Sequence, residues 1–252
     1  MASEATSAVA EAATTRGADK FEPTTRDEIE QFASLAGIRV DEASSSVSSV
    51  RDAENRVVRT RHYVLGGAAA GVTVRMAFDV HEGSITEQAS ARDIAVTRAS
   101  VLLTPVVALA ELEPLVDAAE AKGAIGQLLR MIPRYARLAA QRRDAFAAAR
   151  ELFRGAACAD VQQSGDSDFD VTLRCRPRGA HLFAFDVHWD IAYDAGLSRM
   201  RSTLSFVCHA SPVADGKLAD MEERFLQLVQ QCGFLRALQI VLEVSAVPQQ
   251  QQ

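Results

Sequence analysis

The sequence predicts an α+β protein made of two similar modules, each an antiparallel sheet packed against helices, with a long helix joining them. Apolar and polar residues alternate strictly in two groups of segments, and each group is followed by segments with apolar residues at helical spacing. Hairpin-connected strands followed by paired helices differ from the βαβ alternation of a parallel sheet, so antiparallel pairing is expected. The second half therefore repeats the first in element order.

The composition excludes several classes of protein. The chain has 252 residues, of which 48% are hydrophobic and 24% charged, as in ordinary globular proteins. The net charge of −6 gives no general attraction to phosphate backbones, so direct nucleic-acid binding is not expected. Because no apolar run resembles a secretory signal or is long enough to cross a bilayer, we expect a soluble intracellular protein.

The first module is expected at residues 25–133, after a small, polar, disordered segment at 1–24. Thr24 or Thr25 begins a short helix that ends at Gly37. The elements expected next are strands from 38, over 57–65, over Val72–Val80 and over 94–103, then helices over 109–122 and 125–132, the last ending at Pro133.

The connecting helix and the second module are expected at 134–247, followed by a frayed tail at 248–252. The helix at 134–153 has an apolar stripe and many arginines. The elements expected after it are strands over 171–175, 183–191 and 200–208, with Asp194-Ala195-Gly196 as a three-residue hairpin turn, and two amphipathic helices separated by Gly233.

No pattern of residues specifies a catalytic, metal or cofactor site. The glycine-rich stretch Gly66–Gly71 precedes no helix, so it is interpreted as a loose hairpin loop and not a phosphate cradle. Asp166, Asp168 and Asp170 lack the glycine and glutamate of a calcium loop. No nucleophile elbow, pair of catalytic carboxylates or dinucleotide fingerprint occurs, so neither a cofactor nor catalysis is expected.

Thiols, imidazoles and guanidinium groups are interpreted mainly as structural. The scattered cysteines are expected to be buried free thiols, and the histidines to lie on the surface; a Cys–His dyad across strands stays possible but unspecified. The arginines of the long helix are expected to form a solvated face, or to meet an acidic partner or a phosphate backbone. The residues concerned are Cys158, Cys175, Cys208, Cys232, His62, His81, His181, His188, His209, Arg134, Arg137, Arg142, Arg143 and Arg150.

Several side chains of the second module are candidates for binding a partner protein. Arg174 and Arg176 alternate along one strand and are expected to form a solvated polar face, or to face an acidic partner or a phosphate backbone. The aromatic candidates can instead form the core of the module, and both alternatives stay open at this point. They are Phe183, Phe185 and Trp189 on a strand and Phe225 and Phe234 on the last two helices.

Four stretches of the chain together resemble the centromere protein P family, whose members are tandem RWD-domain subunits of the inner kinetochore. No single motif carries the resemblance; the order of the stretches carries it, over about residues 32–245. They are Phe32–Val40, the strands at Val72–Val80 and 94–105, the helical region at 109–153, and the helix–Gly–helix pair at 225–238.

The resemblance implies a non-catalytic adaptor in the nucleus, at the centromere and kinetochore, that links centromeric chromatin to the outer kinetochore. It implies a heterodimer with a centromere protein O-like tandem RWD subunit, and association with coiled-coil subunits similar to centromere proteins Q and U. Family members often carry a coiled-coil helix before the first module, which residues 1–24 cannot form. Three alternatives are a tandem RWD module of another complex, an unrelated hydrolase or ligand-binding α+β domain, and a ubiquitin-conjugating-enzyme-like fold with Cys208 as nucleophile, although the order Cys208-His209-Ala210-Ser211-Pro212 lacks that family's signature.

Overall fold

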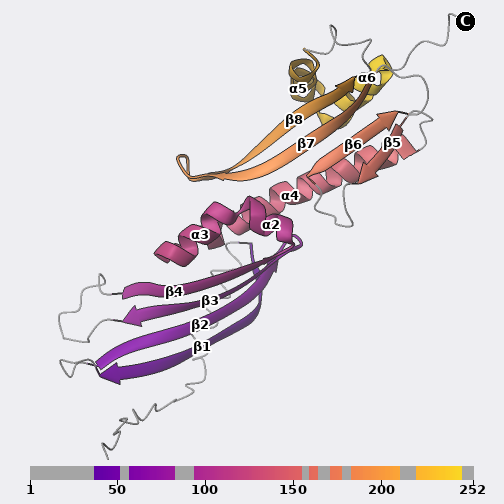
Figure 1. Ribbon diagram of the computed structural model, residues 1–252. Helices are drawn as coiled ribbons and strands as arrows, with labels where there is room; N and C mark the ends of the chain where they lie inside the picture. The colour runs from indigo at the N-terminus through magenta and orange to yellow at the C-terminus, as the bar shows by residue number, and fades with distance from the viewer. Residues whose placement is uncertain are drawn as a thin grey trace, which may run out of the picture. The chain divides into compact units, whose positions relative to one another are not determined.

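The computed structural model describes residues 37–51, 57–82, 94–154, 159–163, 171–177, 183–210 and 220–245 (Figure 1). It has an α+β fold with two antiparallel sheets, each packed against helices, as the sequence predicted. The expected disordered segment, the short helix before Gly37, the Asp166–Asp170 loop and the tail lie outside the described residues.

The described residues form two compact units. One contains residues 37–68, Val74–Leu102 and Val116–Ile125, and the other contains Ala69–Thr73, Leu103–Leu115 and the residues from Gly126 onward. The elements of the first sheet and the helices that follow it are β1 (Arg39–Arg51), β2 (Val57–Ala69), β3 (Val72–Glu82), β4 (Ile94–Thr104), α2 (Val106–Glu111) and α3 (Glu113–Lys122).

The strands of the first sheet are ordered β1-β2-β3-β4. The alternation predicted for β3 is confirmed, because Val74 and Met76 are buried while Arg75 between them is exposed. Strand β2 continues through Gly66 and Gly67, so the loose loop expected there is wrong. The turn is only Ala70-Gly71, and both residues have positive φ, of 44° and 91°, as a two-residue hairpin of this kind requires.

Gly67 lies inside β2 because the neighbouring strand approaches it closely. A Cβ at this position would lie 2.5 Å from the backbone oxygen of Arg39 on β1. The register between β1 and β2 also shifts between Val40 and Glu42, which is a β-bulge next to this contact. The glycine therefore permits a close backbone approach, whereas the sequence pattern alone suggested the start of a loop.

Helix α4 (Ile125–Arg154) is continuous over 30 residues, with Pro133 inside it. The two separate helices expected on either side of this proline are therefore wrong. An interior proline costs about 3 kcal/mol or more because it removes one backbone hydrogen bond and crowds the preceding turn. Ile132 and Tyr135, on its two sides, are both fully buried. Their burial favours the continuous helix despite this cost.

The second sheet has the order β5-β6-β7-β8, with each neighbouring pair antiparallel. Strand β5, whose sequence ADVQQ has little alternation, was not predicted and forms by pairing with β6. The elements are β5 (Ala159–Gln163), β6 (Thr172–Pro177), β7 (Phe183–Asp194), β8 (Arg199–Ala210), α5 (Met221–Cys232) and α6 (Phe234–Ser245).

The β7–β8 hairpin has a four-residue loop, Ala195–Ser198, and not the expected three-residue turn. Asp194 is still part of β7 and pairs with Arg199. Its carboxylate accepts a hydrogen bond of 3.0 Å from the N–H of Leu197, and Ser198 has a positive φ of 47°. The side chain of Asp194 therefore organises the turn, which the position of Gly196 in the sequence did not indicate.

One hydrophobic core joins the second sheet to α4, α5 and α6. Buried residues on alternate positions of β6, β7 and β8 face Phe146 and Phe153 of α4, Phe225 of α5 and Leu238 of α6. Because a strand points successive side chains to opposite faces, these helices share one face of the sheet. The predicted break at Gly233, where φ is 84°, is confirmed between α5 and α6.

Candidate functional site

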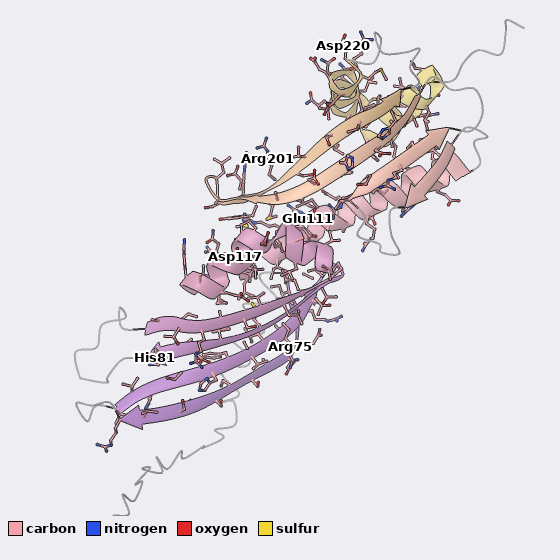
Figure 2. The ribbon with its side chains drawn as sticks, in the orientation of Figure 1. Arg75, His81, Glu111, Asp117, Arg201 and Asp220 are labelled. Atoms are coloured by element: carbon pink, nitrogen blue, oxygen red, sulfur yellow. The ribbon has the colours of Figure 1, made fainter. Side chains whose placement is uncertain are left out.

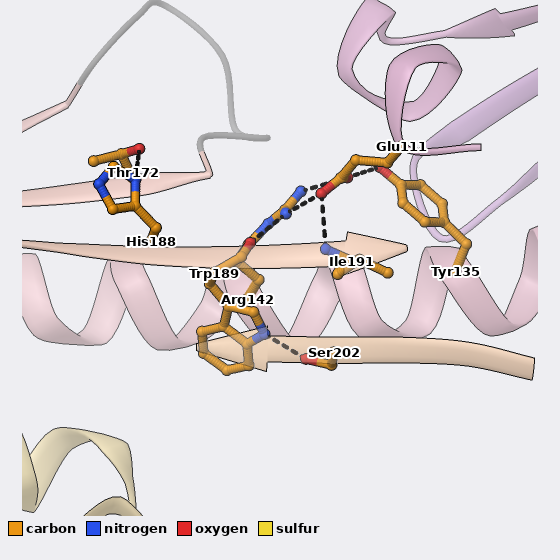
Figure 3. Close-up of polar contacts among 8 residues, drawn as sticks. All are labelled: Glu111, Tyr135, Arg142, Thr172, His188, Trp189, Ile191 and Ser202. Carbon is orange, nitrogen blue, oxygen red and sulfur yellow. Dashed lines mark hydrogen bonds and ion pairs between the residues drawn. The ribbon is translucent and has the colours of Figure 1, made fainter. Parts of the chain in front are cut away.

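The least expected polar group of the chain is Arg142, in the middle of α4. Its side chain is only 1% exposed, although the sequence suggested a solvated arginine face on this helix. The guanidinium donates two hydrogen bonds to the Glu111 carboxylate of α2, of 2.6 Å to Oε1 and 3.1 Å to Oε2 (Figure 3). The expectation of a solvated face is therefore wrong for Arg142, which forms a buried two-point ion pair.

The Glu111–Arg142 pair also binds the backbone of β7. Arg142 donates to the carbonyl oxygen of Trp189 at 2.7 Å, and Glu111 Oε1 accepts from the N–H of Ile191 at 3.1 Å (Figure 3). These two backbone groups point to the side of β7 on which β6 lies. The β6–β7 pairing ends at Thr172↔His188, and only the Trp189 N–H reaches further, to the Val171 oxygen. The two side chains therefore take the place of a neighbouring strand.

Tyr135 completes the network. Its hydroxyl donates a hydrogen bond of 2.6 Å to Glu111 Oε2. Burial and the adjacent Glu111 carboxylate hold the pKa of Tyr135 far above its usual range, so the phenol stays protonated and donates. Glu111 thus accepts from Arg142, Tyr135 and Ile191. A carboxylate engaged in this way fixes positions and is poorly suited to accept a substrate proton.

A second contact lies further along β7. The side-chain amide of Gln127, on α4, donates to the hydroxyl of Tyr193. Helix α2 also contacts β7 directly. Together with the Glu111–Arg142 pair, these contacts bind the part of β7 that extends beyond β6 to two helices. The site is a structural joint within the second unit.

The outer face of the first sheet carries a different cluster, of hydroxyl, imidazole and carboxylate groups. His62 Nδ1 lies 2.7 Å from Asp79 Oδ1, and His62 Nε2 lies 3.1 Å from Ser48 Oγ. Thr60 and His81 form a second pair at 3.2 Å. Strand β3 supplies Asp79 and His81, and His81 is labelled in Figure 2.

The order Ser48–His62–Asp79 is that of a serine–histidine–aspartate triad, but the sheet surface lacks a further requirement of such a site. Acyl transfer needs N–H or side-chain donors directed at the developing oxyanion. In the described part of β1 and β2, the paired backbone N–H groups lie in the plane of the sheet, whereas these side chains project from its face. The cluster is therefore interpreted as cross-strand hydrogen bonding.

The outer face of the second sheet has similar pairs. His209 Nε2 lies 3.0 Å from Asp186 Oδ2, and His188 Nδ1 lies 2.9 Å from the Thr172 hydroxyl. These side chains lie on the face opposite the helices. His209 and Cys208, adjacent on β8, point to opposite faces, as predicted from the alternation.

The predicted partner-binding residues have different environments. Phe185 and Phe225 are fully buried in the core. Trp189 and Phe234 are partly buried, with ring centroids 5.4 Å apart, and the Trp189 indole donates to Ser202 Oγ at 2.6 Å. Arg174 is exposed on β6. Phe183 and Arg176 lie on β7 and β6, but their side chains are outside the described part of the structure.

The cysteines are not all buried. Cys175 is buried, Cys208 is partly buried and Cys232 is exposed, so the prediction of buried thiols is wrong for Cys232. Cys232 lies in the last turn of α5, where its thiol donates to the Leu228 oxygen at 3.1 Å. Burial raises the pKa of Cys208 to about 11, which is opposite to the activation that a nucleophilic cysteine needs.

The sequence contains a signal that could have identified Arg142. Tyr135, Ala139, Phe146 and Ala149 form the buried stripe of α4, and position 142 follows 135 and 139 at helical spacing. A charged residue on a buried stripe requires a partner of opposite charge. The identity of that partner was not predictable, because Glu111 is 31 residues earlier in the chain.

Among the described residues, no group of three or more His, Cys, Asp or Glu side chains is arranged to hold a metal ion. Within the same residues, no helix combines the length and the apolar character needed to cross a membrane. No protein-family model matches the chain, and a search of curated proteins found no match. The function proposed below therefore depends on the sequence and on the geometry.

Proposed function

We propose that the chain is a non-catalytic adaptor made of two RWD-like modules. The observation that carries this proposal is the repeated order of elements. In the second unit a helix, α4, precedes four antiparallel strands, and two helices, α5 and α6, follow them. The first sheet likewise has four strands followed by two helices, α2 and α3. This repetition supports a duplicated module of the kind that the sequence resemblance implies.

The role that fits best is that of a centromere protein P-like subunit of the inner kinetochore. It pairs with a centromere protein O-like tandem RWD subunit and joins coiled-coil subunits similar to centromere proteins Q and U. The adaptor links centromeric chromatin to the outer kinetochore in the nucleus. The net charge of −6 favours contact with chromatin through partner proteins over direct contact with DNA.

The side chains of the two sheets also favour an adaptor over an enzyme. The mostly buried carboxylate of Glu111 accepts hydrogen bonds from three residues, and the described N–H groups of β1 and β2 beside the Ser48–His62–Asp79 cluster lie in the plane of the sheet. The ubiquitin-conjugating alternative needs a thiolate at Cys208, whereas burial raises the pKa of this thiol to about 11. A binding role requires no such chemistry.

The outer face of the second sheet is the surface that we assign to the partner subunit. Its three helices share the opposite face, so this face is not covered by α4, α5 or α6. It carries exposed Arg174 and, on β8, exposed Arg201, which is labelled in Figure 2. An acidic or hydrogen-bonding surface of the partner would complement these guanidinium groups.

The role is tested in cells by tagging the chain, imaging the tag through mitosis and identifying the proteins that co-purify. Paired nuclear foci at centromeres, with co-purification of a second tandem RWD protein, are expected. A tandem RWD partner without centromeric foci would assign the chain to another complex. A diffuse signal without such a partner would refute the kinetochore role.

The assigned surface is tested by reversing one charge. Arg174→Glu is expected to reduce co-purification of the partner at least about tenfold, because a new carboxylate would face its acidic surface. Arg236→Glu is the matched control, since Arg236 is exposed on α6, in the helix layer. Equal binding by both variants would exclude the outer sheet face as the contact.

A further inference from the structure

Helix α4 carries a row of arginines on the face opposite its buried stripe. Arg130, Arg134 and Arg137 are all exposed and are spaced four and then three residues apart, so they lie within about 60° of one another around the helix axis. Leu128 and Ala139, which are buried, lie on the other side of the helix. These three residues, the arginine row, therefore point away from the core.

The arginine row forms no ion pair with any carboxylate in the described part of the chain. Arg130 donates only to the Gly126 carbonyl of its own helix, at 3.0 Å, and Arg134 and Arg137 have no described polar partner. Helix α4 contains no Asp or Glu before Asp144, so none of the three can form a pair one turn away within the helix. Their charges are therefore not neutralised locally among the described residues.

Other arginines of the helix layer do have polar partners. On α5, Arg224 lies 3.8 Å from Asp220, one turn earlier, and on α4 the buried Arg142 is paired with Glu111. A solvated helix face usually mixes charges of both signs. The arginine row instead concentrates positive charge on one exposed face of a chain whose net charge is −6. Such a face attracts an anionic group from outside the chain.

We infer that the arginine row binds an acidic helix of a partner protein. Successive arginines of the row are about 6 Å and then about 4.5 Å apart along the axis, since a helix rises about 1.5 Å per residue. Carboxylates spaced four and then three residues apart on a second helix repeat these separations, so three ion pairs can form together. Each guanidinium can bind a carboxylate through two parallel hydrogen bonds, which gives the contact its geometric specificity.

The charge of the whole chain favours an acidic helix over a nucleic acid as the occupant. A nucleic acid is a long polyanion, so it is repelled by the net charge of −6 over a wide area, and three phosphate contacts offset little of that repulsion. A short acidic helix meets only the local charge of the row. The row is also separate from the outer sheet face assigned above, because α4 lies on the opposite face of that sheet.

The first test measures binding of a synthetic peptide to the purified full-length chain by fluorescence anisotropy at low salt. The probe is a labelled, alanine-based helical peptide with three glutamates spaced four and then three residues apart. The control peptide has the same composition, with its glutamates on different faces of the helix. The probe should bind at least about tenfold more tightly than the control and should dissociate as salt is added. This test does not depend on the kinetochore role, so the two proposals can fail separately.

The second test reverses the charges of the row. The triple variant should lose the probe at least about tenfold and should instead bind a peptide with lysines in place of the glutamates, which also shows that it is folded. A control variant reverses three exposed arginines elsewhere and changes the net charge equally, so it should retain most of the binding. The row variant is Arg130→Glu, Arg134→Glu and Arg137→Glu, and the control is Arg59→Glu, Arg98→Glu and Arg236→Glu.

Four outcomes would overturn the inference. The first is a wild-type chain that binds neither peptide, or both equally. The second is an equal loss of binding in the two triple variants, which would assign the affinity to net charge alone. The third is tighter binding of a labelled DNA duplex than of the peptide, which would make a nucleic acid the occupant. The fourth is a dimer that only the row variant dissociates, which would make a second copy the occupant.

Discussion

Strands β7 and β1 both have backbone groups that no described strand pairs with, and their surroundings differ. On β7, beyond the end of β6, the Trp189 carbonyl and the Ile191 N–H are bound by Arg142 and Glu111. On β1, the residues between Ala43 and Val50 offer only small side chains. The comparison shows that this chain covers the end of β7 with its own buried charges, whereas no strand among the described residues lies beside the outer edge of β1.

The ion pair beside β7 and the small side chains of β1 contribute differently to stability. A buried ion pair is costly to desolvate, and here three hydrogen bonds from Arg142 and the donors from Tyr135 and Ile191 to Glu111 offset that cost. The small polar side chains of β1 need no such matching, since water solvates them. Removing Glu111 or Arg142 should therefore lower the free energy of unfolding much more than a comparable change on the surface.

The largest expected effect comes from Arg142→Ala. It leaves Glu111 buried without its countercharge and the Trp189 carbonyl without its donor, so the free energy of unfolding should fall by about 3–5 kcal/mol. Urea denaturation followed by circular dichroism measures this. Arg143→Ala is the matched control on the adjacent residue, where a longer contact of 3.4 Å to exposed Asp144 predicts a change of less than about 1 kcal/mol.

A double variant, Arg142→Met with Glu111→Leu, sharpens the same comparison. Replacing a buried ion pair by apolar residues often restores stability. Here the recovery should be incomplete, because Ile191 N–H and the Trp189 carbonyl would stay buried without partners. Full recovery would show that the pair does not act as the neighbour of β7.

The next largest loss of stability is expected from a change at Gly67, where β1 lies close to β2. Gly67→Ala places a Cβ about 2.5 Å from the Arg39 oxygen, so β1 must move, and the expected loss is about 1–3 kcal/mol. Gly126→Ala is the control, because a Cβ there meets nothing within 4 Å; in a helix this change should stabilise the chain by about 0.5–1 kcal/mol. Thermal denaturation of both variants separates the outcomes. Equal stability of the two would contradict the close approach of β1 to β2.

The smallest expected change in stability comes from the ionisation of Cys208, on the core-facing side of β8. Burial raises the pKa of Cys208 to about 11, whereas an unfolded cysteine ionises near about 8.5. Between these values the unfolded chain loses a proton that the folded chain keeps. The contribution of Cys208 to stability is therefore fully present below about pH 8.5 and declines as the pH rises toward 11.

Alkylation by iodoacetamide, followed by mass spectrometry, measures this difference. At pH 8 the folded chain should modify Cys208 about two orders of magnitude more slowly than the urea-unfolded chain, because the thiolate is the reactive form. Exposed Cys232 serves as the internal control and should react quickly in the folded chain. Rapid modification of folded Cys208 would refute its burial and would reopen the ubiquitin-conjugating alternative.

The sequence by itself determined those elements whose pattern is local. The alternation of β3, the strands β7 and β8, and the helix pair interrupted by Gly233 were all predictable, because periodicity and a single glycine suffice to specify them. The α+β class and the two antiparallel sheets were predictable for the same reason. Strand β5 was not, since its residues alternate little and its conformation depends on pairing with β6.

Only the tertiary structure decided which polar residues are buried and which of them meet. Arg142 and Glu111 are 31 residues apart, and nothing in either local pattern specifies the contact. Pro133 stays inside a helix because side chains on both of its sides are buried, although its local preference is to end one. In each case packing between distant segments supplied the decisive free energy, and a local pattern carries no information about that packing.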